Sequence, residues 1–412
     1  MTTPTRTVDA TGRTADLRER LVDFMNGHVI PAEAEIDAEL AGNPQLWGAG
    51  PRMTSLKARA RSKGLWNLFL SPDHHPEGLS NAEYAPLAEI MGWSPHVAPE
   101  VFNCAAPDTG NMELLGHFGT PEQKRAWLDP LLAGRIRSCF SMTEPEVASS
   151  DANNIRTRMD LRDGEWVING RKWWSTGALR HECAVALVMG VTDPDAERGR
   201  QQSIVLVPLD TPGVSVLRST RVLGFDDRHE GGHGELVFDD VRVPAANLLG
   251  PRGEGFAVAQ VRLGPGRIHH CMRLIGMAER ALALMVDRAR TRVAFGAPLL
   301  DQGTIQQWVA ESRIDIDAGR LLVLRAAERM DVDGQRAARA EIAMAKVFVP
   351  AAVKRVVDRV IQVHGAMGLS QDSPLPMLYS QARFLQIADG PDEVHRRCLA
   401  RWESTRDTDL VR

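Results

Sequence analysis

The sequence predicts an α+β fold in which an N-terminal helical domain, a middle antiparallel β domain and a C-terminal four-helix bundle follow one another. Apolar residues recur at helical spacing through the first third of the chain. Short apolar runs separated by Gly, Asp, Asn and Pro come next, and long helical stripes fill the last part. We therefore expect three domains, at residues 1–137, 138–250 and 251–412.

Helix-capping patterns mark the expected N-terminal helices. Ser80 or Asn81 is suited to cap a helix that runs through Met91. Thr120 begins a capping box with Gln123 three residues later, and a proline occupies the first turn. Further helices are predicted at residues 16–25, 32–40 and 54–63.

The middle part is expected to be a small antiparallel sheet. The dipeptide Asn169-Gly170 follows a short apolar run and predicts a tight turn there. Strands are predicted at Glu165–Ile168, Ala184–Met189, Ser203–Val207, Val214–Leu217 and Glu235–Phe238. Beyond Gly253, apolar stripes run through residues 274–289, 305–316 and 342–360, which favours a bundle that also forms a subunit interface.

Composition excludes several classes of protein. The chain has 412 residues, of which 43% are hydrophobic and 25% charged, with a formal net charge of -4. Basic tracts and long apolar runs are lacking, so we expect neither a nucleic-acid partner nor a membrane span. The N-terminus lacks the apolar core of a signal peptide. Five widely spaced cysteines argue against a disulfide framework, and we expect a cytoplasmic protein.

Common nucleotide and metal motifs are also missing from the sequence. A GxGxxG after a strand and a GxxxxGK[ST] loop are both absent. Gly250, Gly253 and Gly255 are interpreted as turn residues before a helix. The adjacent His269 and His270 would point in different directions on a helix, so we expect no metal site there.

Three segments carry side chains suited to a polar or aromatic ligand. The loop Cys139–Asp151 groups hydroxyls that suit a polar ring or phosphate, although a Ser/Thr-rich turn has the same composition. In Gly170–Ala178, Trp173 and Trp174 would suit a wall over a flat cofactor, or ordinary packing. Arg292–Leu300 places an Arg past a helix, where it suits a pyrophosphate or the helix dipole.

Near the C-terminus, Asp389 directly precedes Gly390 and Pro391 in the segment Ile387–Arg396. A glycine permits close approach of another group, so such a turn is suited to aim a general base into a pocket. Asp-Gly-Pro is also ordinary turn chemistry, and the segment alone does not separate the two interpretations.

Taken in order, these segments resemble the acyl-CoA dehydrogenase family of flavoproteins over nearly the whole chain. Thr143–Asp151 is similar to the family's TEPxxxxSD loop, with one extra residue, and Lys172–Ala178 is similar to its K-x-W-[IS]-T-[NS]-G strand. Arg292–Gly296 resembles R-x-x-F-G, and Gln362–Leu369 resembles Q-x-x-G-G-x-G. Ordered matches of this kind are much stronger than any one motif.

The resemblance implies FAD as the cofactor and no metal. It places Trp174 and Thr176 beside the flavin ring, and it implies that Arg292 and Phe295 bind the FAD of a neighbouring subunit. It puts Gln362 and Gly365 near the adenine and pyrophosphate. The further FAD contacts in this assignment are Phe140, Met142, Thr143, Ser149, Ser150, Gln302, Ala366, Pro391 and Glu393. The expected acyl-CoA contacts are Ser150, Arg267, His270 and Gly390.

This chain departs from the family pattern at the base. Most members read Glu-Gly-Thr where this chain reads Asp-Gly-Pro at residues 389–391. A minority carry the base directly before an Arg that matches Arg267, but here that residue is Gly266. Asp389 therefore remains the candidate base, as in one branch with a similar ADGPDEVH tail. Some members of that branch are associated with 4-hydroxyacyl-CoA breakdown.

Two departures concern the cofactor. Gly303 stands where many members carry a Gln that contacts FAD, and Gln302 lies beside it. Pro391 removes the hydroxyl and the N–H that the family's Thr provides.

The resemblance implies oxidation of an acyl-CoA to the trans-2-enoyl-CoA, as in fatty acid β-oxidation. Asp389 would take the α-proton, and an electron-transfer flavoprotein would accept the electrons. Free Asp has a pKa of ~3.9, which burial beside substrate and flavin would raise. Asp is also shorter than Glu by about 1.5 Å, one C–C bond. The active form is expected to be a homodimer or homotetramer.

Three rival functions share the resemblance. Nitroalkane oxidases also use an Asp base but would consume oxygen and ignore CoA. Acyl-CoA oxidases differ mainly in their reactivity with oxygen. Some relatives are DNA-binding or assembly proteins, although the net charge of -4 disfavours DNA.

A cationic cluster on one predicted helix bears on the substrate. Arg267, His270 and Arg273 share a face at helical spacing. Unpaired buried polar groups are costly, so the cluster would suit an acyl chain that carries oxygen or phosphate near C4. The alternative is that these residues hold CoA or pair with nearby acids.

Overall fold

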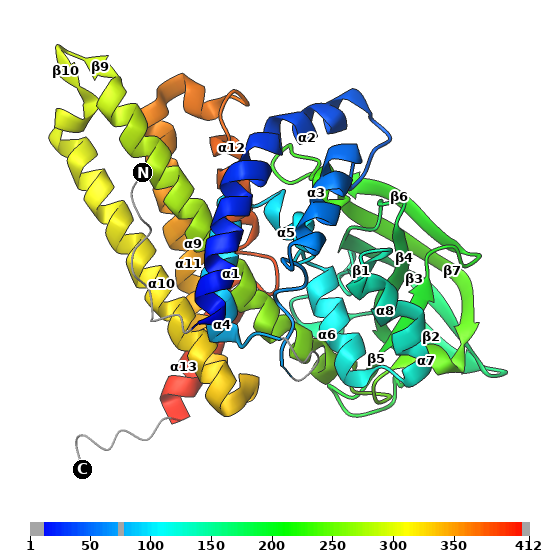
Figure 1. Ribbon diagram of the computed structural model, residues 1–412. Coiled ribbons are helices and arrows are strands. Elements are labelled where there is room, and N and C mark those ends of the chain that lie inside the picture. The colour runs from blue at the N-terminus through cyan, green and yellow to red at the C-terminus, as the bar shows by residue number, and fades with distance from the viewer. Residues whose placement is uncertain (1–11, 73–77, 406–412) are drawn as a thin grey trace. The chain divides into compact units, whose positions relative to one another are not determined.

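The computed structural model describes residues 12–72 and 78–405, and they form two compact units (Figure 1). The first unit combines residues 1–26, 79–98 and 267–412, and the second combines residues 27–78 and 99–266. Each unit therefore joins segments that are far apart in the sequence. Helices before and after a central β sheet confirm the predicted α+β class.

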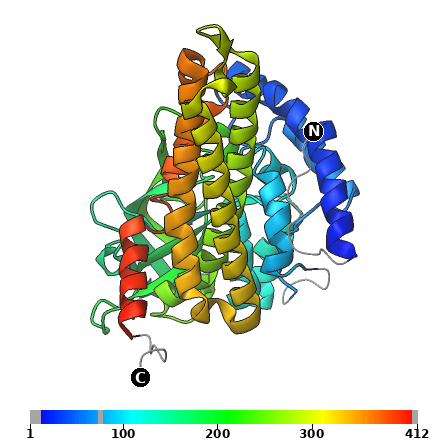
Figure 2. The same cartoon turned by 90° about the vertical axis from the view of Figure 1, so that its left-hand side faces the viewer.

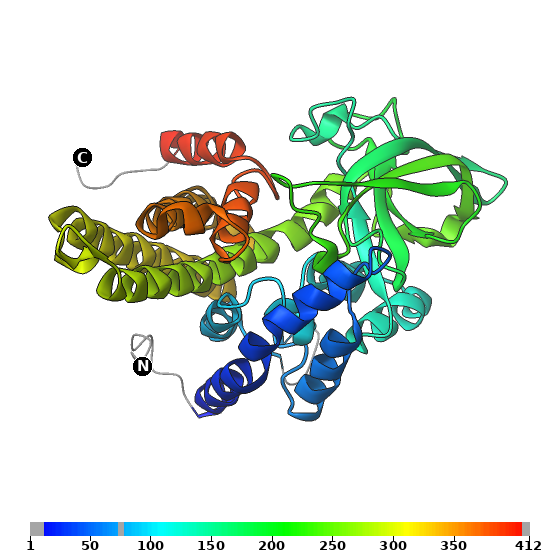
Figure 3. The same ribbon diagram turned by 90° about the horizontal axis from the view of Figure 1, so that it is seen from above.

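The second unit is built on an eight-stranded sheet, whose strands curve around a common core (Figure 3). The main path runs in the order β6-β7-β3-β2-β4-β5-β8, and β1 pairs with β4 in parallel. The strands are β1 Arg137–Ser141, β2 Arg158–Arg162, β3 Glu165–Thr176, β4 Cys183–Val191, β5 Gln202–Pro208, β6 Val214–Thr220, β7 His233–Pro244 and β8 Leu248–Leu249.

Strand β3 corrects one prediction. The expected turn at Asn169-Gly170 is wrong, because β3 continues through both residues and pairs with β7 along its length. The register shifts between Ile168 and Gly170, so the dipeptide marks a β-bulge instead of a hairpin. The hairpin that precedes β3 turns at Asp163 and Gly164, both of which have positive φ.

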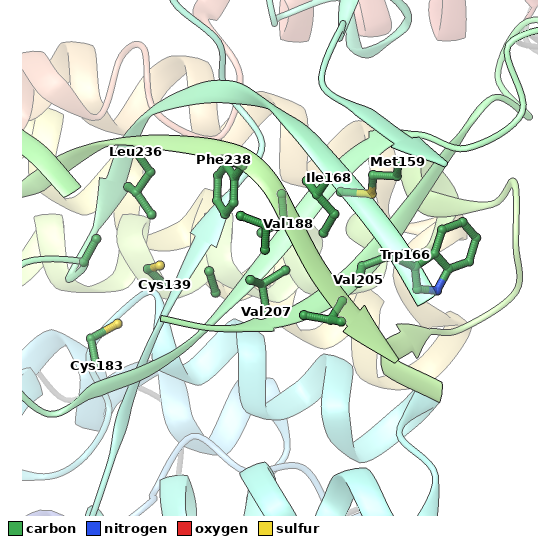
Figure 4. Close-up of a cluster of buried hydrophobic side chains, with 14 residues drawn as sticks. Cys139, Met159, Trp166, Ile168, Cys183, Val188, Val205, Val207, Leu236 and Phe238 are labelled. Carbon is green, nitrogen blue, oxygen red and sulfur yellow. The ribbon is translucent and has the colours of Figure 1, made fainter. Parts of the chain in front are cut away.

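The core of this sheet consists of alternate side chains that point to one side (Figure 4). Trp166, Ile168, Val188, Val205 and Phe238 are each at most 2% exposed within it. Burial of large side chains of this kind stabilises a fold by about 1.5–3 kcal/mol each. The expected core residues Val185, Leu187, Ile204, Val205, Leu206 and Val207 are all fully buried.

Helices of the second unit precede the sheet in the sequence. They are α2 Ile30–Gly42, α3 Pro51–Ser62, α5 Ala98–Val101, α6 Asp108–Phe118, α7 Pro121–Gln123, η2 Lys124–Leu128 and α8 Asp129–Leu132, and η1 Met25–Val29 leads into α2 from the first unit. The predicted capping box of Thr120 and Gln123 is confirmed by reciprocal hydrogen bonds. Buried Arg137 pairs with Glu100 and Asp108, which fixes the start of β1 beside α5 and α6.

The first unit is a helical bundle (Figure 2). Its long helices are α9 Gly255–Thr291, of which the part from Arg267 onward belongs to this unit, α10 Gly303–Ala337 and α11 Arg339–His364. The shorter elements are α1 Arg13–Phe24, α4 Asn81–Met91, the hairpin β9 Val293–Ala294 and β10 Ala297–Pro298, η7 Gly365–Leu369, α12 Leu375–Phe384 and α13 Asp392–Thr405. The long helices expected from the apolar stripes are thus confirmed. None of the helices in the described ranges is long and apolar enough to cross a membrane.

Two features attach α4 to this bundle. Ser80 caps the helix in a capping box with Glu83, as one of the two predicted alternatives has it. Arg320 of α10 donates to both carboxylate oxygens of Glu89 at 2.9 Å. A bidentate pair of this kind fixes orientation as well as distance.

Candidate active site

Asp389 lies in a turn of the first unit, between α12 and α13. Its φ is 57°, in the left-handed region, and Gly390 follows with φ 103°. A Cβ on Gly390 would lie 3.1 Å from Nε2 of His395, so both conformation and space favour glycine there. The Nε atom of Arg267 donates to the backbone carbonyl of Asp389 at 2.9 Å. Arg267, expected to contact substrate, therefore also holds the turn that carries the expected base.

The carboxylate of Asp389 faces a histidine on α9. The distance from Nε2 of His270 to Oδ2 of Asp389 is 3.6 Å, and both side chains are about one-fifth exposed. Arg273 lies one turn further, with its Nη2 atom 3.1 Å from Nδ1 of His270. Because a guanidinium only donates, Nδ1 is the acceptor and the hydrogen of the neutral imidazole belongs on Nε2, toward Asp389.

Lys346 of α11 supports the same turn and was missed by the sequence analysis. Its side chain is fully buried and donates to the backbone carbonyls of Leu385 and Gly390. Burial lowers the pKa of Lys346, although Cys271 and Asp389 act in the opposite direction. Burial likewise lowers the pKa of His395 to about 4, so this histidine is neutral at neutral pH. In the sequence, the signal for this role was a lysine within the apolar stripe of residues 342–360.

The expected adenine and pyrophosphate contacts lie at one end of the bundle (Figure 2). The antiparallel helices bring the hairpin after α9, the start of α10 and the end of α11 to this end. Arg359 of α11 donates to Ser312 of α10 at 3.3 Å, which fixes that alignment. Exposed residues gather there, and those predicted to contact FAD are Arg292, Phe295, Gln302, Gln362, Gly365 and Ala366.

Phe295 is the most informative of these residues. It is fully exposed at the tip of the hairpin and has φ 52°. An exposed aromatic residue in the left-handed region is uncommon, because burial would normally offset the strain. The arrangement suits an aromatic ring that packs against something outside its own chain.

The loop after β1 is held by a buried ion pair in the second unit. Nζ of Lys172 lies 2.8 Å from Glu144 and 2.9 Å from the carbonyl of Met142. Glu144 also accepts hydrogen bonds from Arg156 N, Thr157 N and Thr157 Oγ1. Burial raises the pKa of Glu144, but these donors outweigh it and hold the pKa below its ordinary value. Burial lowers the pKa of Lys172 to about 8.

The same loop carries predicted FAD contacts. The carbonyl of Thr143 accepts a hydrogen bond from Trp173 N at 3.0 Å, which attaches the loop to β3. Ser149 Oγ accepts from Glu144 N at 2.9 Å, so this hydroxyl organises the loop itself. Ser150 is exposed, and the side chain of Met142 is partly buried.

A second bulge in β3 redirects the tryptophan pair. The register with β7 shifts between Lys172 and Ser175, and Trp174 has φ 56°. The Nε1 atom of Trp173 is buried and has no hydrogen-bond partner among the described residues. A buried indole N–H of this kind commonly has a partner, so the site suits a group that accepts a hydrogen bond. The bulge and the unpaired N–H both fit the expectation that a cofactor packs here.

Thr176 ends β3 and contacts a buried histidine. Its Oγ1 atom lies 2.9 Å from Nδ1 of His233, and Nε2 of His233 lies 3.0 Å from Oδ2 of Asp227. The ring of His233 is 5.3 Å from that of Trp174. Neither His233 nor Asp227 was singled out from the sequence, because 50 or more residues separate them from Thr176.

Phe140 has a charged neighbour that the sequence also did not reveal. The guanidinium carbon of Arg262 lies 4.3 Å from the centroid of the Phe140 ring, within range of a cation–π contact. Glu113 of α6 is buried nearby, and burial raises its pKa to about 8 although Arg262 opposes the shift.

The last predicted contacts flank Asp389. Pro391 is partly buried and directly precedes α13, and Glu393 in the first turn is 79% exposed and pairs with Arg396. Within the first unit, Arg267 contacts the backbone carbonyl of Asp389, His270 faces its carboxylate, and Arg273 contacts His270. One member of the predicted cationic cluster therefore faces an acid, and the role of the cluster toward the substrate stays a prediction.

Comparison with known proteins identifies the family. Models of the N-terminal, middle and C-terminal domains of acyl-CoA dehydrogenases match residues 11–135, 139–241 and 253–403. The chain is 57% identical to "Probable acyl-CoA dehydrogenase FadE2" of Mycobacterium tuberculosis over 95% of both chains. It is 50% identical to human "Acyl-CoA dehydrogenase family member 11" over 92% of its own length. The chain spans 49% of that human protein and 36% of the mouse family member 10.

Solved structures agree with the sequence comparisons. A putative acyl-CoA dehydrogenase from Mycobacterium abscessus has a TM-score of 0.92 at 49% identity and covers 96% of this chain and 99% of its own. Butyryl-CoA dehydrogenase from Megasphaera elsdenii has a TM-score of 0.81 at 26% identity and covers 97% of this chain and 100% of its own. These matches confirm the predicted fold and enzyme class. FAD is the cofactor of this family of flavoproteins. The chain belongs to the acyl-CoA dehydrogenase family.

Proposed function

We propose that the protein oxidises an acyl-CoA thioester to its trans-2-enoyl-CoA and passes the electrons to an electron-transfer flavoprotein. The observation that carries the proposal is the Asp389 turn. A carboxylate in a left-handed conformation, fixed through its own backbone carbonyl by Arg267, is a preorganised group. Asp adopts this conformation more readily than most residues, so a role at the site is supported by the way Arg267 and Lys346 fix the turn.

Asp389 is assigned the role of general base. It breaks the α-C–H bond of the thioester by accepting the proton on its carboxylate, and it becomes a carboxylic acid. The Nε2–H group of His270 faces the same carboxylate and orients it. The bound FAD supplies the acceptor for the hydride that leaves the β-carbon. A positioned base commonly contributes about 10²- to 10⁴-fold to a rate.

The residues of each unit fit the cofactor that the family implies. In the second unit, the unpaired N–H of Trp173 and the bulged Trp174 suit a flat polar ring. In the first unit, exposed Arg292 and Phe295 suit the pyrophosphate and ring of an FAD held by a second copy of the chain. We therefore propose a homodimer or homotetramer as the active form.

The acyl group is proposed to be recognised without a charge pair from His270. Nε2 of that histidine faces the carboxylate of Asp389 at 3.6 Å, and its Nδ1 accepts a hydrogen bond from Arg273, so both ring nitrogens have a protein neighbour. These contacts support the proposal that Arg267, His270 and Arg273 mainly position Asp389. An acyl chain with oxygen or phosphate near C4 would then need other polar partners. A panel of acyl-CoAs with and without a C4 substituent decides whether the enzyme prefers a substituted chain.

Anaerobic bleaching of the flavin tests the proposed function. Holoenzyme is mixed with butyryl-, octanoyl- and palmitoyl-CoA and with a 4-substituted acyl-CoA of matched length. We expect rapid bleaching with at least one thioester, and reoxidation that is faster with an electron-transfer flavoprotein than with oxygen. The reverse preference indicates an acyl-CoA oxidase. Oxygen consumption with nitroethane and no bleaching by any thioester would overturn the assignment.

A further inference from the structure

Three buried or partly buried groups of the second unit form a hydrogen-bonded chain behind the predicted flavin contact. Asp227 lies 3.0 Å from Nε2 of His233, whose Nδ1 lies 2.9 Å from the hydroxyl of Thr176. His233 is 1% exposed and Asp227 is 6% exposed, so water does not compete for these bonds. The order carboxylate, imidazole, hydroxyl is one in which each group fixes the hydrogen position of the next.

The directions of the hydrogen bonds follow from the inventory of donors and acceptors. The carboxylate of Asp227 only accepts, so Nε2 of His233 carries the hydrogen. In the neutral ring the Nδ1 atom is then an acceptor, and the hydroxyl of Thr176 donates to it. The only hydrogen of that hydroxyl is thereby used inside the protein. On its outer side, Thr176 offers lone pairs alone.

We propose that Asp227 and His233 are positioning residues that make Thr176 a hydrogen-bond acceptor toward the flavin. The proposal rests on the proposed function, because only the family resemblance places Thr176 beside the ring. As part of the proposal we place N5 of the isoalloxazine ring opposite Thr176, because N5 carries a hydrogen when the ring is reduced and a lone pair when it is oxidised. A fixed acceptor at this position favours the reduced form, and a fixed donor favours the oxidised form.

The backbone at Asp227 makes a clean test available. Asp227 has φ 47°, a conformation that Asn adopts as readily as Asp. In Asp227→Asn the amide donates to Nε2, so the hydrogen of His233 moves to Nδ1 and points at Thr176. The hydroxyl of Thr176 then turns its own hydrogen outward. An Asp-to-Asn change behind a histidine is known to select the wrong tautomer in this way.

The readout is the midpoint potential of the bound FAD, measured by equilibration with a reference dye. We expect Asp227→Asn to lower the potential, with roughly a five- to tenfold higher ratio of oxidised to reduced flavin at a fixed potential, the size of one hydrogen bond. The sign discriminates, because loss of a negative charge by itself favours the more electron-rich reduced flavin and raises the potential. Asp226→Asn is the matched control, since Asp226 pairs with Arg221 and is 37% exposed.

A double-mutant cycle shows whether the effect passes through Thr176. Thr176→Val keeps the β-branched shape and removes the hydroxyl, so Asp227→Asn should cause no further shift in that background. His233→Leu is a second route that changes no charge, and it should also lower the potential only when Thr176 is present. An equal shift of Asp227→Asn with and without the hydroxyl, or a shift to higher potential, would overturn the proposal. A protein that binds no FAD after reconstitution would instead overturn the proposed function.

Discussion

The Nε2 atom of His270 lies 3.6 Å from the Oδ2 atom of Asp389, and Arg273 holds the opposite ring nitrogen of that histidine. This arrangement places a neutral N–H group, fixed in direction, beside the expected base. A neutral donor orients a carboxylate without the strong loss of basicity that a cationic donor causes. The contact between His270 and Asp389 therefore provides a way to orient an aspartate where most family members have the longer glutamate.

Replacement of His270 should slow proton abstraction more than it weakens substrate binding. We expect His270→Leu to reduce the rate of anaerobic bleaching by roughly tenfold, because the carboxylate of Asp389 loses the polar neighbour that orients it. His270→Gln places an amide N–H near the Nε2 position and should recover part of the rate. An acyl-CoA dissociation constant that rises while the bleaching rate stays unchanged would assign His270 to the substrate instead.

Asp389→Asn should abolish the base while it keeps the turn. Asn tolerates a φ of 57° as well as Asp does, so the backbone contact with Arg267 is expected to persist. Bleaching should slow by at least ~10², whereas FAD content and acyl-CoA binding stay at the wild-type level. Stopped-flow absorbance gives the rate, and a wild-type rate would show that Asp389 is not the base. The acids of the next helix, Asp392 and Glu393, would then be tested.

Arg292→Ala should release FAD. Arg292 is exposed directly after α9, and its loss would remove a charge-assisted phosphate contact of about 1.5–3 kcal/mol. Arg290→Ala is the matched control, because Arg290 is an exposed arginine in the last turn of the same helix. The flavin-to-protein absorbance ratio after gel filtration measures the difference. Equal retention of flavin in both variants would contradict the assignment.

Lys172→Met should destabilise the loop that carries Thr143. The change leaves the buried carboxylate of Glu144 without its cation, and breaking such a pair costs about 3–5 kcal/mol. The double variant Lys172→Met with Glu144→Gln should recover much of that loss. Urea unfolding measures stability, and flavin retention reports on the loop. Equal stability of the single and double variants would show that the pair does not act as a unit.

Glu113 should make the protein less stable as the pH rises. Its pKa is raised to about 8 by burial, above the ~4.3 of an exposed glutamate, so the folded state binds the proton more tightly. The stabilisation is complete below the unfolded pKa and is lost as the pH rises through about 8. Each pKa unit of difference between the folded and the unfolded state corresponds to about 1.4 kcal/mol in the free energy of unfolding.

Glu113→Gln should therefore flatten the fall in unfolding free energy between pH 5 and pH 9. Chemical denaturation at several pH values gives that slope. Glu122→Gln serves as the control, because Glu122 is exposed and hydrogen bonds hold its pKa below the ordinary value. A slope unchanged by Glu113→Gln would show that another group titrates in this range.

Sequence patterns that are local predicted much of this protein. The capping boxes at Ser80 and Thr120 and the helical stripes of α9 to α11 depend on residues within a few turns, so they could be read directly. The order of the motifs was enough to identify the family. The choice of Asp389 as the expected base also came from the sequence, because Gly266 has no side chain to act.

The tertiary structure decided what no local pattern contains. Asn169-Gly170 has strong turn propensity, but pairing with β7 keeps both residues in the strand as a bulge. Lys346 appears in a sequence stripe as a lone polar residue, and only the fold shows that it supports the Asp389 turn. The partners of Thr176 and Asp389 lie 57 and 122 residues away, where sequence spacing carries no information about contact. Sequence by itself determined which groups are present, whereas long-range packing determined which hydrogen atoms each group presents to its neighbour.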